Sequence, residues 1–112
     1  MELDAKTLSQ IRGIGGDELL SKLVGLYLEH TPVRLEEIRR SLLAGDWRRT
    51  ERAIHSLRSS SVTLGATDLA EHAAELEQLA NRKERKALES ALPDLESMTR
   101  SVLTSMRQLA GG

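Results

Sequence analysis

Apolar residues recur every three or four positions along almost the whole chain, which is the spacing of helices that bury one face. The pattern predicts a short helix over about residues 4–11, ended by the glycines of "RGIGG", and a second helix capped by Asp17. A restart is expected at Thr31, with Pro32 in the first helical position, and this helix should end at Gly45.

The second half of the chain predicts three further helical segments. Asp46 should cap a helix that runs to Gly65, and Thr67 or Asp68 should begin the next one, whose apolar face is Leu69, Ala73, Leu76 and Ala80. The polar "NRKERK" predicts a turn or a frayed helix end. The last segment has heptad-like spacing but contains Pro93, where we expect a kink or a helix start. Its periodic positions are Leu88, Leu92, Leu95, Thr99, Val102, Met106 and Leu109.

Long amphipathic helices joined by short loops predict an all-α fold, an antiparallel four-helix bundle with one or two short additional N-terminal helices. We expect residues 1–112 to form a single domain with one core. A strict coiled coil is disfavoured because Gly45 and Gly65 interrupt the pattern.

Composition narrows the classes of function. The chain has 16 Lys and Arg against 17 Asp and Glu, so no global charge favours nucleic acid or membrane surfaces. It lacks cysteine, and no apolar run reaches the length of a transmembrane helix. With no Phe, one Trp and one Tyr, it also lacks aromatic platforms for single-stranded nucleic acid. We therefore expect a cytoplasmic monomer that makes no contact with membranes or nucleic acid.

His55 lies in "ERAIHSLRSSSVTLGATDLAEHAAELE", within a predicted helix that also carries three consecutive serines. A rotation of about 100° per residue places a small and apolar face opposite the imidazole, formed by Ala53, Leu57, Ser60 and Leu64. The residues on the same side as His55 are Arg48, Arg52, Arg58, Ser59 and Val62. We therefore expect His55 to be exposed among arginines, whereas Ser60 and Ser61 face the bundle interior and permit close helix approach.

Glu77 is a candidate partner for His55. If the chain reverses at Gly65 and Ala66, Glu77 lies as far beyond the turn as His55 lies before it. A carboxylate that accepts a hydrogen bond from one ring nitrogen fixes the tautomer and orients the ring. The alternative is a solvated Glu77 that pairs with Lys or Arg.

An exposed, oriented imidazole among cations can act as a nucleophile toward a phosphoryl group. The chain has no glycine-rich phosphate loop, no carboxylate cluster typical of a magnesium site and no serine-hydrolase elbow. Its histidines, His30, His55 and His72, share no short spacing typical of metal ligands. We therefore predict no metal or cofactor site in this chain, and any nucleotide or metal would belong to a partner.

The stretch "GDWRRTERAIHSLRSSSVTLGATDLAEHAAELE", from Gly45 to Glu77, resembles the histidine-containing phosphotransfer (HPt) domains of multistep phosphorelays. The resemblance implies that His55 accepts a phosphoryl group from an aspartate of one receiver domain and passes it to another. The receiver would supply an acidic pocket and Mg²⁺, and the partners would be response regulator receiver domains, including that of a hybrid sensor histidine kinase. Arg58 stands where the family has lysine, and Ser59 where it has glycine.

We expect the partner to contact the exposed face of this helix through Arg48, Arg52, Ser56 and Val62. Ser56 follows His55 at the position where self-phosphorylating histidine kinases carry an acid that serves as base. This difference favours a phosphotransfer module without kinase or hydrolase activity of its own. Two alternatives stay open: a non-catalytic helical adaptor that docks a receiver or another helical partner through this face, and a nucleic-acid binder that uses the arginines.

Overall fold

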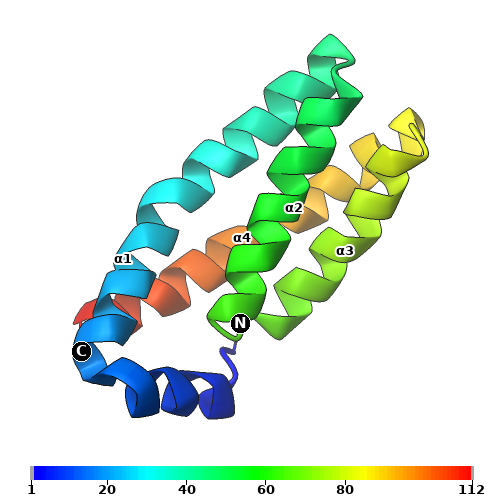
Figure 1. Cartoon of the computed structure of the whole chain (residues 1–112). Coiled ribbons are helices and arrows are strands. Elements are labelled where there is room, and N and C mark those ends of the chain that lie inside the picture. The colour runs from blue at the N-terminus through cyan, green and yellow to red at the C-terminus, as the bar shows by residue number, and fades with distance from the viewer. Residues whose placement is uncertain (1, 112) are drawn as a thin grey trace.

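The computed structural model describes residues 2–111 and contains four helices, which confirms the predicted all-α bundle. The helices pack along one another in a body of 42 × 21 × 21 Å (Figure 1). Their bounds are Ala5–Ala44 for α1, Trp47–Thr63 for α2, Thr67–Asn81 for α3 and Arg85–Gly111 for α4.

Gly16 divides α1 into a short N-terminal segment and a long main part, because its φ of 70° and ψ of −169° break the helical path. The positive φ favours glycine, since a β-carbon makes this conformation costly. Figure 1 shows the N-terminal segment lying across the end of the bundle. One short N-terminal helix is therefore confirmed, but it continues past residue 11 to the glycine kink.

The predicted restart at Thr31 is wrong, because α1 continues through Thr31 and Pro32 without a break. Thr31 is only 2% exposed, so packing against the core holds this turn in place despite the hydrogen bond that proline removes. Pro93 likewise lies inside α4, which begins earlier, at Arg85; Pro93 is therefore not a helix start.

The turns on either side of α2 fix its ends. Gly45 has a φ of 73°, and the Asp46 carboxylate accepts a hydrogen bond from the Arg49 amide at 3.1 Å, which confirms the predicted cap. At the other end, a β-carbon on Gly65 would lie 3.1 Å from Asp4. The Asp4 amide donates to the Gly65 carbonyl at 2.8 Å. The N-terminal segment is thereby attached to the α2–α3 turn.

The apolar faces predicted from the sequence form one continuous core. The predicted face of α3 is buried throughout, and in α4 the periodic positions are buried except Leu92 and Leu109, which are half-buried. Each fully buried leucine contributes about 1.5–3 kcal/mol relative to an exposed one.

Hydroxyl pairs hold α2 against α1 inside this core. The Ser61 Oγ lies 2.9 Å from the Tyr27 hydroxyl, and the Ser41 Oγ lies 2.7 Å from the Thr50 Oγ1. Ser61 is fully buried and Ser60 is half-buried, so the predicted inward orientation of these serines is confirmed. The small side chains allow close approach of the helices, while their hydrogen bonds satisfy polar groups that would be costly to bury alone.

Candidate functional site

His55 lies near the middle of α2 on its exposed face. Its side chain is 57% exposed, whereas Ala53 and Leu57 on the opposite face are 2% and 0% exposed. The residues predicted to share the side of His55 are exposed, except Arg58, which is partly covered. Burial of the opposite face therefore determines the outward orientation of the imidazole.

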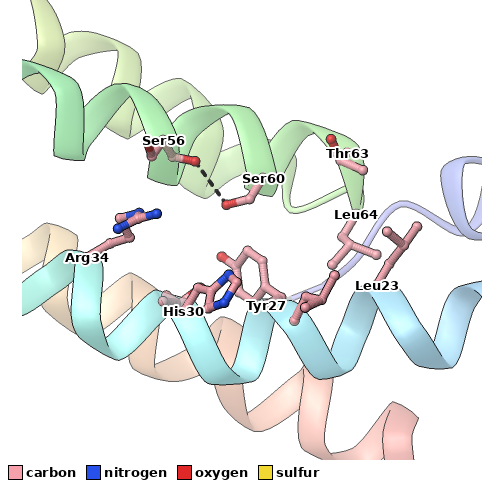
Figure 2. A pocket seen from close by; sticks show the side chains of 10 residues that line it. Leu23, Tyr27, His30, Arg34, Ser56, Ser60, Thr63 and Leu64 are labelled. Atoms are coloured by element: carbon pink, nitrogen blue, oxygen red, sulfur yellow. Dashed lines mark hydrogen bonds between the residues drawn. The ribbon is translucent and has the colours of Figure 1, made fainter.

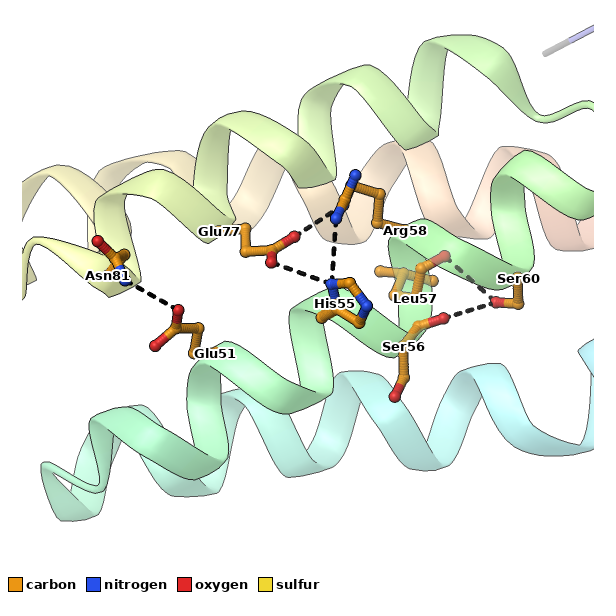
Figure 3. Close-up of polar contacts among 8 residues, drawn as sticks. All are labelled: Glu51, His55, Ser56, Leu57, Arg58, Ser60, Glu77 and Asn81. Atoms are coloured by element: carbon orange, nitrogen blue, oxygen red, sulfur yellow. Dashed lines mark hydrogen bonds and ion pairs between the residues drawn. The ribbon is translucent and has the colours of Figure 1, made fainter.

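Glu77 reaches the His55 ring from α3, as the counting across the turn predicts. The Glu77 Oε2 lies 3.0 Å from the His55 Nδ1, and the Glu77 side chain is 18% exposed (Figure 3). The contact joins residues that are 22 positions apart in the chain. The prediction that the two side chains meet is confirmed.

Arg58 completes a three-residue cluster with His55 and Glu77. Its Nε donates to the Glu77 Oε1 at 2.7 Å, and its Nη2 lies 3.1 Å from the His55 Nδ1. For Glu77, a bond to His55 and an ion pair with Lys or Arg are the alternatives that the sequence leaves open; the structure shows both, with Arg58 as the cation that the sequence had not named. The signal available was the three-residue spacing, which places positions 55 and 58 on neighbouring parts of one helix surface.

The cluster selects one tautomer of the imidazole. A carboxylate can only accept hydrogen bonds and a guanidinium can only donate them. The His55 Nδ1 lies 3.0 Å from the Glu77 Oε2. If Nδ1 carries a proton, this contact is a hydrogen bond; without the proton, two lone pairs face each other and repel. The Arg58 Nη2, 3.1 Å from Nδ1, could donate to this nitrogen only in the other tautomer. We assign the proton to Nδ1 because the bond to the Glu77 carboxylate is then charge-assisted, while the Arg58 Nε keeps its own bond to Glu77.

With the proton on Nδ1, the lone pair lies on Nε2. Figure 3 shows this second ring nitrogen on the side of the ring away from Glu77 and Arg58. Within residues 2–111, Nε2 makes no hydrogen bond. The neutral ring therefore presents a free nucleophilic nitrogen to the solvent.

The helices that carry the cluster are held from both sides. One turn before His55, the Glu51 Oε1 accepts a hydrogen bond from the Asn81 Nδ2 of α3 at 3.0 Å. On the other side, the Tyr27–Ser61 pair connects α2 to α1. These bonds limit rotation of α2 and keep the direction of the imidazole fixed.

The other predicted site residues lie around the ring without contacting it. Arg48, Arg52 and Ser59 are exposed, and Val62 is 59% exposed, an unusual value for an aliphatic side chain. Ser56 is half-buried on the side of α2 that faces α1. Together they form a basic and partly apolar surface around Nε2.

Two further observations concern the described residues. Over residues 2–111, no group of three or more His, Asp or Glu side chains has an arrangement that could hold a metal ion. In the same part of the chain, none of the helices combines the length and apolar character needed to cross a bilayer.

Comparison with solved structures supports the resemblance seen in the sequence. The crystal structure of histidine-containing phosphotransfer protein B (HptB) from Pseudomonas aeruginosa PAO1 matches with a TM-score of 0.90 and 26% identity, over 97% of this chain and 94% of that chain. A proposed histidine-containing phosphotransfer protein from rice shares the fold, with a TM-score of 0.81 and 19% identity over 97% of this chain and 81% of that chain. Comparison with curated proteins gives no significant match.

The sequence model of the Hpt domain matches residues 22–110, which include all of α2 and α3 and the His55 cluster. The match covers most of the chain, and the fold agrees with it. The chain therefore belongs to the Hpt domain family, whose members are phosphorelay intermediates of two-component signalling.

Proposed function

We propose that His55 accepts a phosphoryl group from the aspartate of one receiver domain and passes it to the aspartate of another. The observation that carries this proposal is the exposed imidazole whose Nδ1 contacts Glu77 at 3.0 Å and whose Nε2 is free. Membership of the Hpt domain family supports the same role.

The transfer conserves atoms and charge without a proton donor in solution. The Nε2 lone pair forms the N–P bond while the P–O bond to the receiver aspartate breaks, and that electron pair leaves with the carboxylate. The Nδ1 proton stays in its hydrogen bond to Glu77. In the onward step the P–N bond breaks, its electron pair returns to Nε2, and a second aspartate receives the phosphoryl group. Mg²⁺, supplied by the receiver, would neutralise charge on the transferring oxygens.

Glu77 and Arg58 act as positioning residues in this proposal. Glu77 keeps the proton on Nδ1, and Arg58 holds the Glu77 carboxylate in place through the 2.7 Å bond. Arginine serves this purpose better than lysine, because its planar fork can face the carboxylate and the ring together. Ser59 lies one turn from His55 on the same exposed face, at the edge of the docking surface.

The exposed arginines on α2 would speed association with receivers, whose active-site rim is acidic. Arg48 and Arg52 lie on the side of His55, and Val62 provides an apolar contact. Long-range attraction of this kind raises association rates and weakens with salt. The residue that directly follows His55 is Ser56, where self-phosphorylating kinases carry an acid that serves as base, so we propose a carrier of phosphoryl groups and no kinase activity. A hybrid sensor histidine kinase is the expected source of the phosphoryl group.

A transfer assay tests the proposal. Isolated receiver domains are phosphorylated with radiolabelled acetyl phosphate and Mg²⁺ and mixed with wild type, His55→Gln, or the control His72→Gln, which changes a half-buried histidine on α3. We expect acid-labile label on wild type and on His72→Gln only. Equal labelling of His55→Gln would contradict the proposal. Tight receiver binding without transfer at any ratio would instead support a non-catalytic adaptor.

A further inference from the structure

A recess between α1 and α2 opens beside the phosphoacceptor. It has a volume of about 220 Å³, and its walls include Leu26, Tyr27, His30 and Arg34 of α1 and Ser56 and Ser60 of α2. Figure 2 shows the two groups of side chains facing each other across the gap between the helices. We call this feature the α1–α2 recess.

The recess has the size and lining of a site for one side chain. A cavity of about 150 Å³ lined by apolar residues is enough to hold benzene, so about 220 Å³ accommodates a side chain between leucine and phenylalanine in size. Leu23, Leu26 and Leu64 supply apolar walls. The hydroxyl of Tyr27 is already hydrogen-bonded to Ser61, so an apolar side chain in the recess would not leave it without a partner.

The recess opens on the flank of α2 that faces α1, next to the exposed face that carries His55. Ser56, which lines the recess, directly follows His55, and Ser60 lies one turn further, about 7.5 Å along the helix axis from His55. A standard protein interface covers about 800 Å² on each partner, which corresponds to a radius of about 16 Å. A receiver centred on His55 that extends over the α1 side of α2 therefore reaches the recess.

The charge around the recess favours an acidic partner. Its lining contains Arg34 and His30, and among the described residues that line it none is acidic. Arg34 faces Glu37 at 3.7 Å, too far for a strong hydrogen bond, and its side chain is 37% exposed. This ion pair uses the Arg34 Nη1, and within residues 2–111 the Nε and Nη2 make no hydrogen bond, so they can donate to a carboxylate at the rim.

We propose that the α1–α2 recess determines which receivers this chain accepts, by taking one apolar side chain that lies next to a carboxylate on the receiver surface. The inference rests on the proposed function, because it assigns the docking contact of the same phosphoryl transfer. Leu26 and Ser60 are then specificity-determining residues. Neither touches the imidazole or its partners, Glu77 and Arg58.

The test compares two recess variants with a matched control. Leu26→Glu places a charge at the mouth of the recess, where Leu26 is 42% exposed, and Ser60→Leu fills the recess from α2. Leu43→Glu makes the same change as Leu26→Glu at an 86% exposed position of α1 that does not line the recess. Helical circular dichroism establishes that each variant is folded.

The probe is the phosphorylated receiver domain that labels wild type fastest. We expect Leu26→Glu and Ser60→Leu to raise the receiver concentration for half-maximal transfer about tenfold, with the maximal rate unchanged, and Leu43→Glu to match wild type. If Leu26→Glu transfers with the kinetics of wild type, or if only its maximal rate falls, the recess proposal is wrong. Either result would leave the proposed function standing. Failure of every receiver to label wild-type His55 would overturn the proposed function as well.

Discussion

Removal of the Glu77 carboxylate tests how the structure prepares His55 for transfer. In Glu77→Ala the His55 Nδ1 loses its hydrogen-bond acceptor. The Arg58 Nη2, which lies 3.1 Å from Nδ1 in the wild-type structure, remains as a donor. The guanidinium would then favour the tautomer with a proton on Nε2, and that nitrogen would no longer hold a lone pair for attack.

The magnitude follows from the hydrogen bond that is lost. A hydrogen bond to a charged group contributes about 1.5–3 kcal/mol. The His55 side chain is 57% exposed, so solvent screening favours the lower end of that range. Because about 1.4 kcal/mol corresponds to a factor of ten, we expect Glu77→Ala to slow single-turnover transfer about tenfold. The transfer rate of Glu77→Gln should lie between the rates of wild type and Glu77→Ala. The glutamine has a single amide oxygen, so it can replace only one of the two bonds that Glu77 makes to His55 and Arg58.

The assay measures the transfer rate from a saturating phosphorylated receiver, together with the imidazole tautomer from long-range ¹H–¹⁵N spectra. Glu71→Ala is the matched control, because it removes one exposed carboxylate from α3, the helix that carries Glu77, and Glu71 makes no bond to the ring. A Glu77→Ala rate within about twofold of wild type, with an unchanged tautomer, would refute this reasoning.

Three further substitutions or conditions give distinct readouts. Arg52→Glu should slow association with the receiver at low salt while leaving the helical circular dichroism unchanged; equal rates at low salt would contradict electrostatic steering. Leu57→Asp should destabilise the fold by at least about 4 kcal/mol in urea titrations, because Leu57 is 0% exposed and the new carboxylate has no partner; a smaller loss would show that this face can open. Burial raises the pKa of Tyr27 above its ordinary 10.0, although the hydrogen bond from Ser61 acts in the opposite direction. Because the pKa is higher in the folded state, this contribution to stability is complete below pH 10 and is lost as the pH rises through the folded-state pKa. The phenolate absorbance of this single tyrosine should therefore appear together with loss of helix, and its appearance with the helix intact would contradict this assignment.

The contact between His55 and Glu77 could be predicted because it depends on regular geometry alone. Two helices that reverse at Gly65 rise by the same distance per residue, so equal counts on either side of the turn reach the same height. The exposed face of α2 was predictable for a similar reason, since burial of Leu57 and Ala53 determines the direction of every other residue on the helix.

The features that the sequence did not predict depend on packing between distant residues. Thr31 and Pro32 are typical of a helix start, yet burial of Thr31 keeps α1 continuous through them. That Arg58 is the cation that pairs with Glu77 depends on the rotamer of a long side chain, which helical spacing does not determine. The α1–α2 recess depends on the gap left between two packed surfaces, which has no signature in either helix alone.

NMR of the phosphorylated chain with ¹⁵N-labelled histidine identifies the nitrogen atom that receives the phosphoryl group. We expect a phosphorus coupling to the Nε2 of His55, a retained proton on its Nδ1, and unchanged signals from His30 and His72. Phosphorylation at Nδ1 of His55, or on either of the other two histidines, would contradict this prediction.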